Sequence, residues 1–163
     1  QIPSLGPIRS ALAVALIQLR GFRPQDFARF HPGGSLGASL KFVADIMHTR
    51  ERLPLVGEDK VMSEAIVIMT QKSFGCLGIV DAKGRLVGMI TDGDLRRHMG
   101  ATLLRQRTQD IMTRKPNTLA PNTLASTALE QFNALKRTQM FVVDKGKPVG
   151  ILHVHDLLRA GVA

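Results

Sequence analysis

The sequence predicts an α/β (α+β) fold built from two tandem copies of one unit, because short strings recur at a nearly constant spacing. Asp-Ile-Met at 45–47 returns at 110–112, an offset of 65 (110 − 45). Val-Gly-Met-Ile at 87–90 returns as Val-Gly-Ile-Leu at 149–152, an offset of 62 (149 − 87). Self-similarity at a fixed period is typical of repeated structural units. Within each copy the apolar pattern indicates the order strand, helix, strand, strand, helix.

A helical period follows a short extended stretch in both copies. Apolar residues fall at i, i+3, i+4 and i+7 over 62–69 and again over 125–132, which predicts two equivalent helices. Polar residues near their starts offer N-terminal caps. The expected caps are Ser63 or Asp59 for the first helix and Asn122 or Thr123 for the second.

Two apolar strands and a short helix complete each copy. A tight glycine-containing turn separates the strands, which is typical of an antiparallel hairpin. The predicted elements are a strand over 76–80, a turn at Gly84, a strand ending at Ile90 and a helix over 93–99, and then a strand over 139–143, a turn at Gly146, a strand ending at Leu152 and a helix over 156–160.

The repeat divides the chain into three parts: residues 1–40, which do not repeat, a first copy over 41–101 and a second over 102–163. A start at Gln1, ahead of a Pro- and Gly-rich sequence, leads us to expect a piece of a longer protein. One unit of about sixty residues is marginal alone, so we expect the copies to pack face to face. Pseudo-twofold symmetry then predicts two clefts between them.

Composition excludes several classes of protein. Hydrophobic residues make up 44% of the 163 residues, which is enough for a core and argues against disorder. The single Cys76 cannot form an intrachain disulfide, and no Cys/His cluster has zinc-ligand spacing, so we expect no metal site and a reducing, cytoplasmic location. No apolar run approaches the ~20 residues that span a bilayer. The net charge of +9 indicates an anionic partner: nucleic acid, an acidic membrane or a phosphorylated ligand.

The junction of a strand and a helix at Thr91-Asp92-Gly93-Asp94 is the best candidate site. A Thr hydroxyl can bind a phosphate oxygen, and a carboxylate one turn later can accept hydrogen bonds from ribose hydroxyls. Arg96 and Arg97 add positive charge nearby. The alternative is a capping box, with Thr91 and Asp94 serving only helix stability. The sequence leaves both interpretations open.

The second copy repeats this site with changes. Asp156 recurs in the place of Asp94, but His153 replaces the threonine and His155 replaces Gly93. The two clefts are therefore expected to differ. Because His153 and His155 alternate along a stretch predicted to be extended, they are expected to face opposite sides and not to share a metal ion.

The two copies resemble a pair of cystathionine β-synthase (CBS) domains, a Bateman module, in the Asp-Ile-Met opening, the strand ending in Val-Asp, and the segment Val-Gly-Met-Ile-Thr-Asp-Gly-Asp-Leu-Arg-Arg. Such pairs bind adenosine-type nucleotides or related ligands in their clefts and regulate an attached enzyme or channel. The resemblance implies that Thr91 and Asp94 hold the ribose and phosphate side of a ligand, with Asp156 as the counterpart. His153 departs from the Ser or Thr of the family.

The leading segment resembles the C-terminal edge of the sugar isomerase (SIS) domain of D-arabinose 5-phosphate isomerases, in Ala13–Leu16, Arg20–Phe22, Asp26–Ala28 and His31–Gly37. These enzymes interconvert ribulose 5-phosphate and arabinose 5-phosphate for the lipopolysaccharide sugar Kdo, and no cofactor is implied. The resemblance makes His31 the one active-site residue in this chain, so the chain alone is expected to be inactive. Alternatively, His31 only forms a hydrogen bond within a Pro-Gly turn.

Three functions follow from the sequence. The first is a regulatory ligand-binding module of such an isomerase, with an adenine nucleotide or the nucleotide sugar CMP-Kdo as ligand. The second is a structural module that assembles a homodimer or tetramer without a ligand. The third, nucleic-acid binding, is disfavoured because the basic residues between 96 and 115 have no aromatic side chain among them for base stacking. Membrane binding is disfavoured as well.

Overall fold

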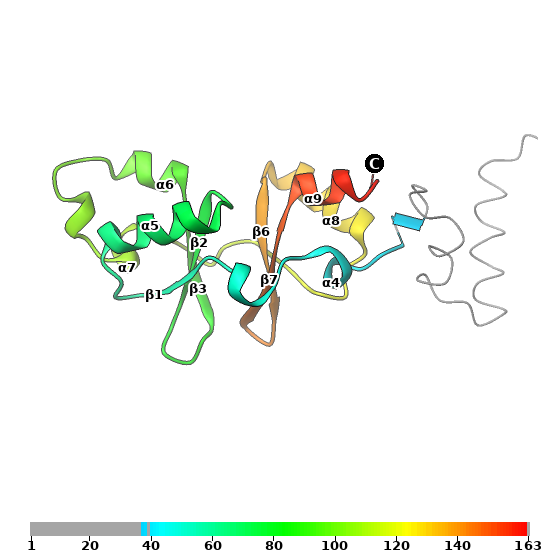
Figure 1. Ribbon diagram of the computed structural model, residues 1–163, viewed down its shortest axis with the longest axis horizontal. Coiled ribbons are helices and arrows are strands. Elements are labelled where there is room, and N and C mark those ends of the chain that lie inside the picture. The colour runs from blue at the N-terminus through cyan, green and yellow to red at the C-terminus, as the bar shows by residue number, and fades with distance from the viewer. Residues whose placement is uncertain (1–36, 39, 163) are drawn as a thin grey trace, which may run out of the picture.

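The computed structural model describes residues 37–38 and 40–162, which form two lobes with one small sheet each (Figure 1). The first sheet has the order β1-β2-β3-β4 and the second β5-β6-β7. In each sheet a short parallel strand lies beside an antiparallel hairpin. The strands are β1 Leu55–Gly57, β2 Cys76–Val80, β3 Leu86–Thr91, β4 Thr113–Arg114, β5 Thr118–Leu119, β6 Gln139–Asp144 and β7 Lys147–His153.

Helices cover the sheets in the predicted order. The sequence of elements is β1-α5-β2-β3-α6 in the first lobe and β5-α8-β6-β7-α9 in the second, so the predicted fold class is confirmed. Among the described residues, none of the helices has the length and apolar character needed to cross a membrane. The helices are α4 Val43–Ile46, α5 Met62–Lys72, α6 Asp92–Arg97, α7 Thr108–Ile111, α8 Ala125–Leu135 and α9 Val154–Arg159, with short 3-10 turns η1 Arg50–Arg52 and η2 Leu103–Arg105.

The two sheets pack against each other in the middle of the molecule, with α5 and α6 on one side and α8 and α9 on the other (Figure 1). Phe141 and Ile151 of the second lobe are fully buried there with Cys76 of the first. Burial, with the Asp92 carboxylate as a lesser cause, raises the pKa of the Cys76 thiol to about 12. The thiol therefore stays neutral and acts as an apolar packing group.

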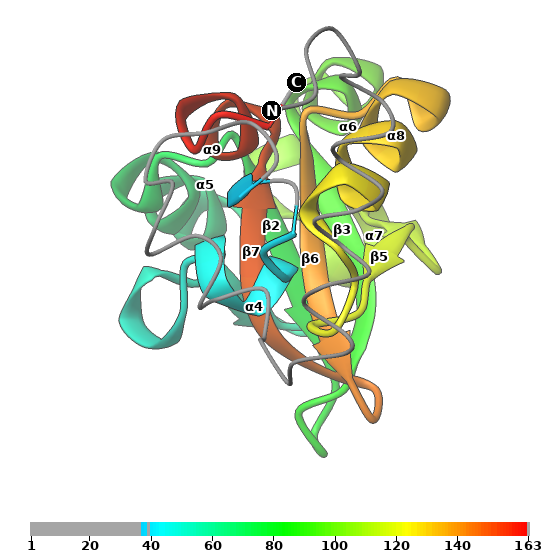
Figure 2. The same ribbon diagram turned by 90° about the vertical axis from the view of Figure 1, so that its right-hand side faces the viewer.

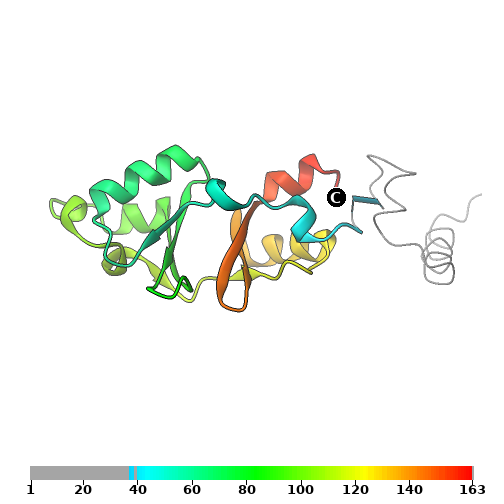
Figure 3. The ribbon, with the colours of Figure 1, turned by 60° about the horizontal axis from the view of Figure 1, so that its bottom comes forward.

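The opening segment of the first copy packs on the second lobe. Residues 40–48, which we call the first exchange segment, cross to the side of β7 and α8 (Figure 1, Figure 2 and Figure 3). The Val43 N–H donates to the Thr123 carbonyl at 2.8 Å, and His48 exchanges two backbone hydrogen bonds with Ile151 at 2.9 and 3.0 Å. Val43 is completely buried in the core of the second lobe. This placement cannot be read from the linear repeat.

The opening segment of the second copy packs in turn on the first lobe. Residues 106–114, the second exchange segment, contribute β4, which pairs with β3. The Thr108 side chain is fully buried, and its hydroxyl donates to the carbonyls of Gly57 and Glu58 at 2.6 and 2.8 Å. The lobes therefore exchange equivalent segments, and each lobe is completed by the other copy.

The exchange segments also cap the long helices, so the predicted side-chain caps are wrong. The N-cap residues are Val61 and Leu124, and neither makes a side-chain cap hydrogen bond. The first helical N–H groups instead donate to exchange-segment carbonyls at 2.8 Å, from Met62 to Gln106 and from Ala125 to Lys41. A backbone carbonyl satisfies an orphan N–H group as well as a polar side chain does.

A methionine on each exchange segment packs over a glycine in the sheet of the lobe that the segment joins. Met112 lies over Gly88, and Met47 lies over Gly150. A Cβ added to Gly150 would lie 2.8 Å from the Met47 Cγ atom, and one added to Gly88 would lie 2.8 Å from the Met112 Cγ atom. Both values are far below van der Waals contact, so the absence of a side chain at these glycines is what admits the methionines.

We expect Gly150→Ala to lower the free energy of unfolding by about 1–3 kcal/mol, because the added methyl group overpacks the contact with Met47. Gly100→Ala is the control, since no atom lies within 4 Å of a Cβ there. Urea unfolding of both variants measures the difference. Combining Gly150→Ala with Met47→Ala should give less destabilisation than the sum of the two single changes. Strict additivity would contradict the contact.

Candidate functional site

A cleft of about 250 Å³ opens between the lobes around the predicted Thr91–Asp94 site, and we call it the first cleft. Thr91 ends β3, and Asp94 and Arg97 follow on α6, so one strand–helix junction supplies one wall. The second exchange segment, the residues that follow it at 116–117, Arg137 and β6 of the second lobe supply the rest. The lining residues are Met89, Thr91, Asp94, Arg97, Thr113, Pro116, Asn117, Arg137, Gln139 and Met140.

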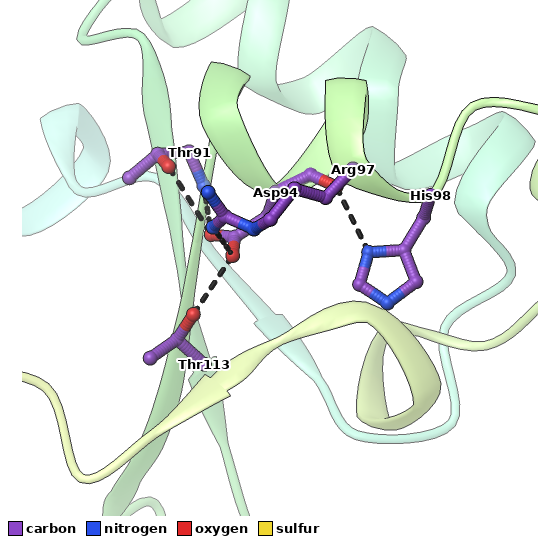
Figure 4. Close-up of polar contacts among 5 residues, drawn as sticks. All are labelled: Thr91, Asp94, Arg97, His98 and Thr113. Atoms are coloured by element: carbon purple, nitrogen blue, oxygen red, sulfur yellow. Dashed lines mark hydrogen bonds and ion pairs between the residues drawn. The ribbon is translucent and has the colours of Figure 1, made fainter.

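The Asp94 carboxylate is the centre of this site (Figure 4). Its Oδ2 accepts hydrogen bonds from the Thr91 N–H at 2.9 Å and the Thr91 hydroxyl at 3.1 Å. Its Oδ1 accepts from the Arg97 guanidinium at 2.5 Å and the Thr113 hydroxyl at 2.8 Å. Asp94 is only 3% exposed. Both of its oxygens are thus occupied by donors of this chain.

These contacts fix the charge of Asp94. Burial alone raises the pKa of this carboxyl, but hydrogen bonds from the Thr91 N–H, Thr113, Arg97 and the Thr91 hydroxyl outweigh it. The pKa therefore lies below the usual 3.8, and the group is ionised near neutral pH. The Thr91–Asp94 backbone bond is part of a capping box at the start of α6. The same carboxylate also lines the cleft, so the two interpretations are compatible.

Positive charge surrounds the first cleft. Arg97 lies on one wall and Arg137 lies on the opposite wall, from the second lobe. A polar hollow of about 340 Å³ adjoins it and is lined in addition by Arg96 and Lys136. Arg137 and Arg96 form no ion pair within the described part of the chain. Their guanidinium groups are therefore available to an anion.

The pseudo-symmetric counterpart is the second cleft, of about 260 Å³. It lies around the start of α9, on the side where the first exchange segment meets the second lobe. The described residues therefore form two clefts, as the repeat predicted, with different linings. The second cleft is lined by His48, Arg52, Ser73, Phe74, His153, His155, Asp156 and Arg159.

Asp156 repeats the geometry of Asp94 with different donors. Its Oδ2 accepts from the His153 N–H at 2.8 Å, and its Oδ1 lies 2.7 Å from an Arg159 nitrogen and 3.1 Å from His48 Nε2. Burial acts to raise the pKa of Asp156, but its hydrogen bonds to His153, His48 and Arg159 lower it overall. His48 thus takes the place that Thr113 holds beside Asp94.

His153 and His155 lie on the same side, so the expectation that they face opposite ways is wrong. Their rings stack with centroids 4.8 Å apart and planes 15° apart. The reason is that the strand ends at His153 and α9 begins at Val154, so the alternation of an extended chain no longer applies. No group of three potential His, Cys, Asp or Glu metal ligands occurs among the described residues.

His153 caps α9 with its ring. The His155 N–H donates to His153 Nδ1 at 3.0 Å, which requires that nitrogen to be unprotonated. Burial is the largest cause that lowers the pKa of His153 below 6.5, His155 and Arg159 add to it, and Asp156 opposes it. A neutral imidazole therefore replaces the threonine hydroxyl of the first copy.

The structure brings most of the predicted site residues together and adds others. Thr91, Asp94 and Arg97 share the first cleft, whereas Arg96 lines only the adjoining hollow. His153, His155 and Asp156 share the second cleft. His31 lies outside the described residues. Sequence reasoning missed Thr113, Arg137, His48, Phe74 and Arg159.

The repeat itself carried a signal for two of the missed residues. Thr113 and His48 each follow an Asp-Ile-Met tripeptide directly, so they occupy equivalent positions. Nothing local marks Arg137, because its counterpart at an offset of 63 (137 − 74) is Phe74. A position that changes its chemistry between the copies is not visible as a repeat.

Comparison with known proteins agrees with the fold. The chain belongs to the CBS-domain family, because a family model of the CBS domain matches residues 43–101 and 109–163. Residues 1–42 lie outside that match. The pair arrangement seen in the two lobes is therefore that of tandem CBS domains.

Curated relatives connect this pair to one group of longer proteins. Arabinose 5-phosphate isomerase KdsD of Yersinia pestis is 44% identical over 155 residues, which cover 93% of this chain and 47% of that protein. The protein of the same name from Escherichia coli K12 is 42% identical, with the same coverage. The chain spans about half the length of these relatives.

Solved structures show the same architecture. CBSX2 of Arabidopsis thaliana, in a crystal structure with AMP, gives a TM-score of 0.64 at 26% identity, over 73% of this chain and 94% of that one. The CBS domain of a CBS domain-containing membrane protein from Sphaerobacter thermophilus gives a TM-score of 0.66 at 25% identity, over 85% and 98%. Both comparisons cover the two lobes.

We expect acidification to weaken the His153 cap. A group with a lowered folded-state pKa stabilises the fold above its unfolded-state pKa, and this stability is lost as pH falls through the folded-state pKa. Wild type should therefore lose free energy of unfolding from about pH 7 downward. The His153→Thr variant carries the threonine of the first copy at this N-cap. Its free energy of unfolding should fall by about 1 kcal/mol less than that of wild type over the same pH range, because this is the typical contribution of an N-cap. Urea unfolding at several pH values measures this, and parallel profiles would contradict it.

Proposed function

We propose that this chain is a regulatory ligand-binding CBS pair whose first cleft binds a nucleotide or nucleotide sugar. The observation that carries the proposal is the placement of Thr91, Asp94 and Arg97 on one wall of a cleft, opposite Arg137 of the other lobe. The AMP complex of CBSX2 supports a nucleotide as the ligand class. The roles of these residues are part of the proposal.

Each wall of the first cleft suits one part of such a ligand. Asp94 accepts hydrogen bonds from ribose hydroxyls, in exchange for those from Thr113 or Arg97. Once released, Arg97 pairs with a phosphate together with Arg137, since guanidinium groups bind phosphate in a bidentate way. The apolar lining from Met89, Pro116 and Met140 receives the base.

We assign this pair to a D-arabinose 5-phosphate isomerase. Support comes from the relatives of that name and from the SIS-like segment that includes His31. In this proposal residues 1–40 are the remnant of the isomerase domain and its linker, and 41–101 and 102–163 are the two CBS domains. The enzyme is cytoplasmic, needs no cofactor, and feeds Kdo and lipopolysaccharide synthesis. Its regulatory ligand is CMP-Kdo or an adenine nucleotide.

A second candidate function is a structural oligomerisation module without a ligand. Several apolar side chains on the helices are exposed, which favours contact with a second copy in a homodimer or tetramer. Both functions can coexist, because the clefts lie between the lobes and the helices on their outer sides. The exposed residues on α5, α8 and α9 are Val67, Leu135 and Leu158.

Isothermal calorimetry of the 163-residue chain with AMP, ATP, CMP and CMP-Kdo tests the ligand proposal. We expect at least one to bind, and Arg137→Gln to weaken it about tenfold, because a charge-assisted hydrogen bond is lost. Arg137 is exposed and forms no ion pair with the residues that the structure describes, so the substitution should leave the free energy of unfolding unchanged.

Lys147→Gln is the matched control, since Lys147 is an exposed cation outside both clefts. It should leave the affinity unchanged. If none of the four compounds binds, the ligand proposal fails and the oligomerisation module remains, to be measured by light scattering. An equal loss in both variants would indicate a general charge effect rather than a site.

The isomerase assignment is tested separately. The full-length protein should convert ribulose 5-phosphate to arabinose 5-phosphate, and the 163-residue chain should not, because a single histidine cannot supply the base, the ring-opening group and the phosphate site. In the full-length protein His31→Ala should lower kcat by at least about a hundredfold, the range of general acid–base catalysis. An unchanged kcat would indicate that His31 only forms a hydrogen bond within the Pro-Gly turn.

A further inference from the structure

The second cleft keeps the carboxylate and the following arginine of the first, and it differs from the first in its other lining residues. His153 stands for Thr91 in the backbone contact to the carboxylate, but its ring accepts from the His155 N–H. His48 stands for Thr113 beside Asp156 Oδ1. Phe74 stands for Arg137 at the end of the long helix, one residue after a left-handed C-cap in both lobes. The first cleft is lined by hydroxyl groups and the second by imidazole rings.

Two arginines face the second cleft with a single acid between them. Arg159 reaches Asp156 at 2.7 Å, whereas Arg52 forms no ion pair within the described residues. Arg52 instead holds its guanidinium carbon 5.7 Å from the centroid of the Phe74 ring. The aromatic face orients a cation whose hydrogen-bond donors stay available. The imidazole N–H groups of His153 and His155 add further donors.

The donors that hold Asp156 are harder to displace than those of Asp94, although Asp156 is slightly more exposed, at 8% against 3%. In the first cleft a ligand hydroxyl needs only to rotate the Thr113 hydroxyl away from the carboxylate. In the second cleft the donor equivalent to Thr113 is the His48 ring, which packs against the Phe74 ring at a centroid distance of 5.1 Å. The backbone of His48 is fixed by two hydrogen bonds to Ile151. A ligand that offers an anion to the arginines avoids this cost.

We propose that the second cleft is a separate anion site, which takes the phosphate monoester of a small sugar on Arg52, Arg159 and His155 and excludes nucleotides. This deepens the proposed function by giving the two clefts different ligand classes. Arginines pair with phosphate oxygens in a bidentate way, and imidazole N–H groups complete the shell. Phosphorylated sugars are also the compounds that the proposed isomerase would convert.

Ligand binding in the second cleft is coupled to the first exchange segment. His48 ends this segment and shares Asp156 Oδ1 with Arg159. When a phosphate draws Arg159 toward itself, His48 becomes the main donor to that oxygen. Occupancy of the second cleft therefore changes how residues 40–48 are held on the second lobe. No equivalent link joins the first cleft to this segment in the described residues, because Thr113 belongs to the second exchange segment.

The test uses ribose 5-phosphate, which carries a phosphate monoester and no base, and the 163-residue chain. Calorimetry measures the affinity, and the ring resonances of His48 and His155 in proton NMR report the place of binding. We expect these resonances to shift and Arg52→Met to weaken binding about tenfold or more, the effect of losing a hydrogen bond to a charged group. Arg137→Met, which removes an arginine from the first cleft, should leave the affinity for ribose 5-phosphate unchanged.

The outcomes separate the two clefts. Inorganic phosphate should compete with ribose 5-phosphate, and uncharged ribose should not bind. Loss of ribose 5-phosphate binding in Arg137→Met but not in Arg52→Met would place it in the first cleft and overturn the proposal. Absence of binding at millimolar ribose 5-phosphate would also overturn it. Nucleotide binding that is weakened by Arg137→Gln would support the proposed function of the first cleft independently of that result. Nucleotide binding weakened by Arg52→Met would overturn the exclusion of nucleotides.

Discussion

The exchange of opening segments between the two lobes is the constraint on which the other features of this molecule depend. Each segment satisfies the first N–H group of the opposite lobe's long helix, and its methionine fills the space over a sheet glycine, Gly88 or Gly150. Neither lobe would have a complete core or satisfied helix ends by itself. The relative position of the lobes is thereby set, and with it the width of both clefts.

The clefts follow from this arrangement because a residue near the end of each exchange segment reaches a carboxylate of the lobe that the segment joins. Thr113 donates to Asp94, and His48 lies 3.1 Å from Asp156. The two sites share a carboxylate, a backbone donor and an arginine three residues later. They differ in their remaining donors, which makes one cleft hydroxyl-lined and the other imidazole-lined. The pseudo-symmetry thus preserves a framework within which the chemistry has diverged.

Much of the fold was predictable because its signals are local. The period of apolar residues over 62–69 and 125–132 marked both long helices, and the apolar runs marked the hairpins. The helix caps were not predictable, because a distant carbonyl replaced the side chains of Ser63 and Asn122. The orientation of His155 was mispredicted because α9 begins at Val154, two residues before the predicted helix start at 156. Both errors arise where a boundary is set by contacts distant in sequence.

The sequence by itself determined the repeat, the order of the elements and the two carboxylates at equivalent junctions, since each of these is encoded in residues close together along the chain. Only the tertiary structure decided which lobe each opening segment joins, and therefore that Arg137 and Arg97 share one cleft while Arg52 and Phe74 share the other. Two nearly equivalent surfaces compete for each segment, and the choice between them rests on long-range packing and backbone hydrogen bonds.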